Sequence, residues 1–177
     1  MKNPGTFWNG ILLSSLLCAT VSFAQETPKL SDAEVASVAV VANQIDIAYA
    51  DIAKEKSKDA EILKFAETMV NDHNAVIAQA AALVKKLGVT PKDNDVSKKL
   101  LADAETTKKA LRSKSAREFN KAYIDNEVAY HKAVIDAVDG LLIPETENAE
   151  LKALLQNVLP ALKTHLAHAE MVQKSFK

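Results

Sequence analysis

The chain has 177 residues, of which 22 are Lys or Arg and 23 are Asp or Glu, so its net charge at pH 7 is −1. This balance provides no strongly basic surface, and we expect no nucleic-acid partner. Four Gly and five Pro leave few places for turns, while Ala, Leu, Lys and Glu are abundant. The composition therefore favours a globular helical protein.

The N-terminal segment has the pattern of a secretory signal peptide. Lys2 precedes an apolar run over residues 11–21, and the small residues Ser22 and Ala24 frame a cleavage site after Ala24. The apolar run is too short to span a bilayer. We therefore predict that residues 1–24 are a signal peptide and are removed.

A lipoprotein signal is the alternative, because Cys18 lies within the apolar run. That signal usually has a small residue directly before the Cys, and Leu17 occupies this position, so we favour the ordinary signal peptide. Residues 25–177 then contain no Cys, and 21 basic residues face 23 acidic ones. We predict that they form a single periplasmic domain without a membrane-spanning helix.

Apolar residues recur every three or four positions along four long segments, which is typical of helices that share a core. The first begins at Ser31, whose spacing to Glu34 predicts a capping box, and ends near Lys56. The second covers about 59–87 and ends at Gly88, a residue suited to the left-handed conformation that terminates helices.

A shorter, more polar helix is predicted over 96–111, where the apolar stripe is thin. The next long helix begins with a capping box from Ser115 to Glu118 and ends near Gly140, and the last covers about 149–176. Four long helices with a long second connection indicate an all-α, ferritin-like four-helix bundle. In this fold the short extra helix lies in the crossover between helices two and three.

Three of the four histidines, His73, His131 and His165, occupy inward positions near the middle of their helices. The middles of helices of similar length lie at similar heights in a bundle, so we expect the three rings to meet in one layer. Asp46 lies at the middle of the first helix and completes this layer.

Imidazole and carboxylate groups together suit a transition-metal ion, and zinc, copper and iron are the candidates. Glu127 lies one helical turn before His131 and is the second candidate carboxylate. Asp72 points about 100° away from His73, which suits a contact with a neighbour better than shared coordination. The predicted metal-binding residues are His73, His131, His165, Asp46 and Glu127.

A structural polar layer is the alternative reading, with the histidines bonded to carboxylates or to Tyr49, Tyr123 and Tyr130. The protein would then be a structural or interaction protein of the cell envelope, and the exposed crossover, residues 90–114, would contact its partner. An enzyme is the least supported reading, because the sequence has no nucleophile–base arrangement and no Gly-rich phosphate loop.

A di-iron centre of the ferritin type is not expected. Such centres use Glu-x-x-His on two helices. The residues three positions before the seam histidines are Val70, Val128 and Leu162, and none of them is acidic.

Three segments carry a resemblance to a known family. They are FAETMVNDH (65–73), YIDNEVAYH (123–131) and LPALKTHLAHA (159–169). They resemble the signature segments of the bacterial domain-of-unknown-function 4142 family, whose members are exported proteins with a ferritin-like helical fold and no established biochemical activity. The resemblance covers nearly all of the chain after the signal peptide.

The resemblance implies signature positions at Asp72, His73, His131, Pro160 and His165. It also implies an acidic residue in the first helix, which Asp46 matches. The sequence departs from the family pattern at Tyr130, where the family usually has Asp directly before the second histidine. Glu127 lies one turn away and is the candidate to replace that carboxylate.

Overall fold

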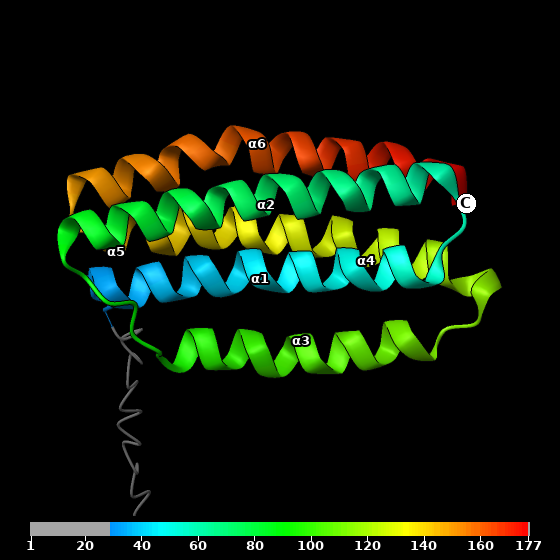
Figure 1. The fold of residues 1–177 in the computed structure, drawn as a ribbon, viewed down its shortest axis with the longest axis horizontal. Coiled ribbons are helices and arrows are strands. Elements are labelled where there is room, and N and C mark those ends of the chain that lie inside the picture. Colours follow the sequence, from blue (N-terminus) through cyan, green and yellow to red (C-terminus); the bar gives the residue numbers. More distant parts are fainter. Residues whose placement is uncertain (1–28, 177) are drawn as a thin grey trace, which may run out of the picture.

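The computed structural model describes residues 29–176, and within this range every element is helical. The predicted signal peptide, residues 1–24, lies outside the described residues. The long helices are α1 (Asp32–Lys56), α2 (Ala60–Leu87), α3 (Asp95–Ser113), α4 (Ala116–Ala137) and α6 (Ala149–Gln173). Figure 1 shows α1, α2, α4 and α6 side by side along the long axis, with α3 along the outside of α1. The all-α prediction is confirmed.

The predicted helix starts follow from local hydrogen bonds. The main-chain N–H and the hydroxyl of Ser31 both donate to Glu34 Oε2, at 3.0 and 2.7 Å, as the capping-box spacing predicts. Gly88 ends α2 with a φ of 64°, in the left-handed region. The crossover helix α3 has 19 residues and is longer than its thin apolar stripe predicts, because Asn94 caps it by accepting from two main-chain N–H groups.

Helix α4 ends at Ala137, close to Gly140 as predicted, but helical turns continue beyond this point. The chain continues as a π-helix (η1, Val138–Leu142) and then as the short α5 (Ile143–Glu145). Gly140 is not among the described glycines with positive φ, so it provides no left-handed stop. The helical turns end at Thr146, whose hydroxyl donates to the carbonyl of Leu142 at 2.6 Å. A short 3₁₀ turn, η2 (Lys174–Phe176), follows α6.

Helix α1 is strongly apolar. By length and composition alone it is long and apolar enough to cross a membrane, with a mean hydropathy of 1.3. Of the segment concerned, 61% is buried inside the protein, against neighbouring helices. Burial by α2, α3 and α4 accounts for this composition, as in the central helix of a soluble protein.

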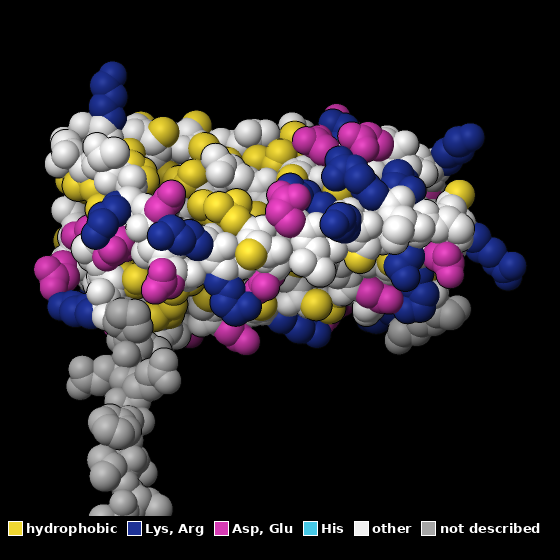
Figure 2. Space-filling view, turned by 90° about the horizontal axis from the view of Figure 1, so that it is seen from below, with side chains coloured by type: hydrophobic (Ala, Val, Ile, Leu, Met, Phe, Trp, Pro, Cys, Tyr) yellow, Lys and Arg dark blue, Asp and Glu magenta, His cyan; other side chains and the backbone are white. Residues whose placement is uncertain are grey.

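The core consists of two clusters of buried side chains. At one end aromatic and large aliphatic residues pack together, and we call this part the packed end; it includes Ile52, Ile62, Phe65, Phe119 and Tyr123. At the other end the core is built from aliphatic residues only, and we call this part the open end; it includes Val38, Val138, Leu142, Leu151 and Leu155. Figure 2, viewed from the α3 side, shows hydrophobic side chains gathered mainly over the half nearer α5, which is the half of the open end.

Candidate metal centre

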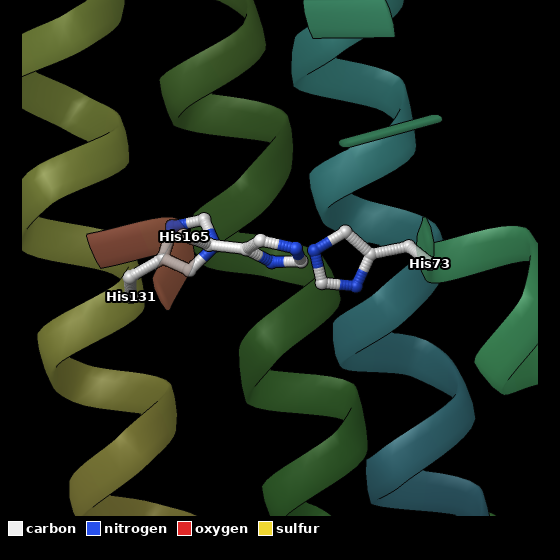
Figure 3. A group of neighbouring side chains, drawn as sticks. All are labelled: His73, His131 and His165. Atoms are coloured by element: carbon white, nitrogen blue, oxygen red, sulfur yellow. The ribbon is translucent and has the colours of Figure 1, made fainter. Parts of the chain in front are cut away.

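Three helices bring three histidine rings to one level between the two ends of the core. His73 comes from α2, His131 from α4 and His165 from α6. The ring centroids lie 5.3 to 6.0 Å apart, and the residues are only 4%, 1% and 6% exposed. Figure 3 shows the rings side by side at this level, as their seam positions predict.

In two of the rings, Nδ1 donates a hydrogen bond to an oxygen atom. His73 Nδ1 lies 2.7 Å from Asn43 Oδ1, and the amide nitrogen of Asn43 donates to the carbonyl of Ala39, which fixes the amide orientation. His131 Nδ1 lies 2.9 Å from the main-chain carbonyl of Glu127. Because an amide or carbonyl oxygen only accepts, each Nδ1 carries the proton, and each Nε2 keeps its lone pair.

The third ring is held by a carboxylate near the surface. His165 Nε2 donates to Asp72 Oδ2 at 2.8 Å, and about half of the Asp72 side chain is exposed. This contact agrees with the neighbour role expected for Asp72. The other ring nitrogens, His73 Nε2, His131 Nε2 and His165 Nδ1, are buried and have no hydrogen-bond partner in the described structure. Each histidine therefore has one satisfied nitrogen and one free lone pair.

Asp46 of α1 is the carboxylate closest to these lone pairs. It is 1% exposed, and its Oδ2 lies 3.3 Å from His73 Nε2 and 3.5 Å from His131 Nε2. Neither carboxylate oxygen has a partner with hydrogen-bond geometry among the described residues. Ligand atoms about 2.0–2.1 Å from a tetrahedral zinc ion are about 3.4 Å from one another. The two measured separations therefore match the edges of such a coordination shell.

The five predicted metal-binding residues do not form a single group, because Glu127 lies away from His73 and His165. One candidate ligand atom from each of His73, His131 and His165 forms one group within 4.8 Å, and Asp46, Glu127 and His131 form a second group. Glu127 Oε2 is 3.6 Å from His131 Nδ1, the nitrogen that already donates to a carbonyl. Burial, and then the charge of Asp46, raise the pKa of Glu127 well above its usual range. Glu127 thus lies beside Asp46 as a buried acid whose neutral form is favoured.

Burial favours the neutral form of two of the three rings, those of His131 and His165. Burial lowers the pKa of His131, and Asp46 opposes this effect only in part. Burial also lowers the pKa of His165, against the contribution of its hydrogen bond to Asp72. Neutral imidazole is the form that binds metal ions, so the site is prepared to act as a ligand set at neutral pH.

Of the contacts that the alternative reading expects, the described residues show those to carboxylates, Asp72 at His165 and Asp46 near His73 and His131, but no hydrogen bond from a tyrosine to these rings. The Tyr130 hydroxyl donates to the carbonyl of Ala42 at 2.8 Å, and the Tyr123 hydroxyl has no partner among the described groups. His168, the fourth histidine, packs its ring 5.1 Å from that of Phe65 and is outside the cluster. Sequence reasoning missed Asn43, although its place one turn before Asp46 on the same helix was a usable signal.

A cavity of about 670 Å³ begins at the histidine layer. The three histidines and Asp46 are among its lining residues, whereas Glu127 is not. The remaining wall is mostly Ala, Val and Leu from the open end, including Leu142, Leu151 and Leu155. The polar layer therefore has one side facing a hollow apolar space and one side facing the packed end.

Fold and site together define a helical bundle with a buried histidine and carboxylate cluster. The family model described as Domain of unknown function (DUF4142) matches residues 19–172, and the chain belongs to this family. Neither a search of curated proteins nor a search of solved structures found a match.

Proposed function

We propose that the chain binds one transition-metal ion through His73, His131, His165 and Asp46. The observation that carries this proposal is the set of buried, partnerless ligand atoms: one nitrogen from each ring and the oxygens of Asp46. Leaving such atoms without partners in a protein interior is costly, and a bound cation removes that cost. Three nitrogens and one oxygen suit zinc, copper or iron, whereas magnesium and calcium favour shells of oxygen alone.

The hydrogen bond made by the second nitrogen of each ring also supports a metal site. Histidines that bind metals usually donate their second nitrogen to a carboxylate, a main-chain carbonyl or a similar acceptor, which fixes the ring orientation. Asn43, Glu127 and Asp72 provide these acceptors, one for each ring. The alternative, a purely structural polar layer, is less well supported, because His165 Nδ1 and both oxygens of Asp46 have no partner with hydrogen-bond geometry among the described residues.

The test is a titration of chelator-treated protein with zinc, copper(II) and iron(II), followed by calorimetry. We expect one saturable site per chain, and binding weakened more than about 100-fold in a His73→Ala, His131→Ala double variant. His168→Ala is the matched control, because it removes a histidine outside the cluster. No saturable binding, or equal affinity in the double variant, contradicts the proposal.

We also propose that the protein is exported to the periplasm and has a ferritin-like four-helix arrangement, with α3 in the crossover. The N-terminal pattern and the long connection between α2 and α4 support these assignments. Mass spectrometry of the protein from a periplasmic fraction tests export, with a mature chain starting at Gln25 as the expected result. A cytoplasmic chain that retains residues 1–24 contradicts it.

A further inference from the structure

The cavity beside the histidine layer has the size and shape of a binding site for an elongated molecule. Its volume of about 670 Å³ lies within the range of about 300–1,000 Å³ typical of small-molecule sites. Its lining on α6 extends from His165 back to Leu151, which corresponds to about 21 Å along the helix at 1.5 Å per residue. The cavity is therefore long as well as large.

The chemistry of the wall changes from one end to the other. At the histidine layer the wall is polar, and farther into the open end it consists largely of aliphatic side chains such as Val38, Leu142 and Leu155. An apolar wall of this kind gives water few partners and favours an apolar occupant. The wall thus suits a molecule with one polar end and an apolar body.

The charge of the lining restricts the polar end of the occupant. No Lys or Arg is among the described residues that line the cavity. A divalent ion held by three neutral histidines and the single charge of Asp46 keeps one positive charge in its own shell. Asp72 lies on the other side of the His165 ring, at Nε2, and Asp103 accepts from Lys99 at 2.7 Å. An acidic head group therefore complements the layer.

The cavity reaches the surface beside α2 and α6. Ala75 and Gln79 of α2 and Ala161 of α6 line it and are exposed. A single alkyl chain matches the length of this cavity better than a compact ring system does.

We propose that the cavity binds a single-chain carboxylic acid, with the alkyl chain in the open end and the carboxylate at the ion held by His73, His131, His165 and Asp46. This inference rests on the proposed metal site. The alkyl chain contributes affinity through burial, and the carboxylate completes the shell of the ion on the side that faces the cavity.

The experiment uses the full chain loaded with one cobalt(II) ion, whose visible absorption reports its ligands. Laurate, kept below its micelle concentration, is titrated against acetate, which lacks the chain, and dodecanol, which lacks the carboxylate. We expect laurate to change the spectrum saturably and to bind at least 100-fold more tightly than acetate. Shorter acids should weaken by about fourfold per methylene removed. Dodecanol should leave the spectrum unchanged.

Two matched variants locate the site. Val158→Phe places a larger side chain in the cavity lining, whereas Val96→Phe changes a half-buried Val of the same hydrophobic cluster that does not line the cavity. We expect Val158→Phe to weaken laurate binding at least tenfold and Val96→Phe to leave it unchanged, with cobalt binding intact in both.

The outcomes separate the two proposals. Normal cobalt binding with equal affinities for laurate and acetate, or with no effect of Val158→Phe, overturns the carboxylic-acid site and leaves the metal site standing. Failure of the unaltered chain to bind cobalt overturns the metal site, and the carboxylic-acid site falls with it.

Discussion

The packed end and the open end of the core belong to the same helical bundle but are filled to different degrees. At the packed end Phe65, Phe119 and Tyr123 are fully buried, and the Phe119 and Tyr123 rings stack with a centroid separation of 6.1 Å. At the open end Leu, Val and Ala side chains leave a cavity of about 670 Å³. Large rings close the space between the helices, whereas short aliphatic side chains at similar helix spacing do not.

The difference suggests a division of roles. A core at full packing density supplies stability and holds neighbouring side chains in fixed rotamers. The histidine layer lies against this core, so its geometry is fixed before any ion binds, as a precise ligand set requires. The open end gives up packing, and with it some stability, in exchange for space beside the layer.

The largest expected effect is on the unfolding free energy, when one buried side chain is truncated at each end of the core. Ile62→Ala removes a fully buried side chain from the packed end and should cost about 4 kcal/mol of unfolding free energy. Leu155→Ala, beside the existing cavity, should cost about 2 kcal/mol, because part of its surroundings is already empty. Urea unfolding of both variants measures the difference. Equal losses would show that the two ends are packed alike.

The reverse substitution tests the same comparison by adding volume. Ala66→Leu inserts a larger side chain at a fully buried position of the packed end, and overpacking should cost about 2 kcal/mol. Ala39 lines the cavity, so the larger side chain of Ala39→Leu has room. This substitution should change the unfolding free energy by less than about 0.5 kcal/mol. Thermal unfolding of the metal-free proteins reads this out. A large loss in Ala39→Leu would mean that the cavity closes in solution.

An intermediate effect is expected at the exposed edge of the histidine layer. Asp72→Asn keeps the size of the side chain but weakens the acceptor for His165 Nε2. We expect metal affinity to fall about 30-fold, in line with other outer contacts of metal-binding histidines. Calorimetric titration with zinc measures it, and Asp136→Asn, an exposed acid elsewhere on α4, is the control. An unchanged affinity would show that Asp72 does not support the site.

The smallest expected effect is on the pH dependence of stability, to which Glu127, His131 and His165 contribute. The raised pKa of Glu127 means that the folded chain keeps a proton that the unfolded chain releases above about pH 4.5, so stability falls as pH rises towards the folded value. The lowered pKa values of His131 and His165 mean that the unfolded chain takes up protons below about pH 6.5 that the folded chain refuses. Stability therefore also falls on acidification below that pH.

Glu127→Gln removes the first of these two contributions. In the metal-free variant the contribution that lowers stability as pH rises above about 4.5 should disappear, a change of at most about 1.4 kcal/mol per pH unit, so the loss below pH 6.5 becomes steeper. Urea unfolding between pH 5 and pH 8 compares the variant with the unaltered chain. Parallel stability curves would contradict a raised pKa of Glu127.

The sequence predicted those features that depend on local spacing. The Ser31–Glu34 capping box, the stop at Gly88 and the common level of His73, His131 and His165 follow from hydrogen-bond spacing and helix periodicity. The first two features are decided within a few turns of one helix, and the common level follows from the place of each histidine near the middle of its own helix. A heptad-like count along the chain therefore carries the necessary information.

Features that depend on the shape of the whole interior were not predicted. The π-helix buries Val138 and Leu142, the first and last of its five residues, and the position of Glu127 relative to Asp46 depends on the rotation of two helices about their axes. The cavity depends on the difference between the space inside the bundle and the summed side-chain volumes, and no single residue encodes this difference. Asn43 was missed because its role depends on His73, which lies 30 positions away.

X-ray absorption spectroscopy of the zinc-loaded protein tests the central claim most directly, because it reports the identity and distance of the atoms around the ion. The account predicts three imidazole nitrogens at about 2.0–2.1 Å and at least one oxygen at about 2.0–2.2 Å. A shell with fewer than two imidazoles, or a six-oxygen shell typical of a surface-bound ion, would contradict it.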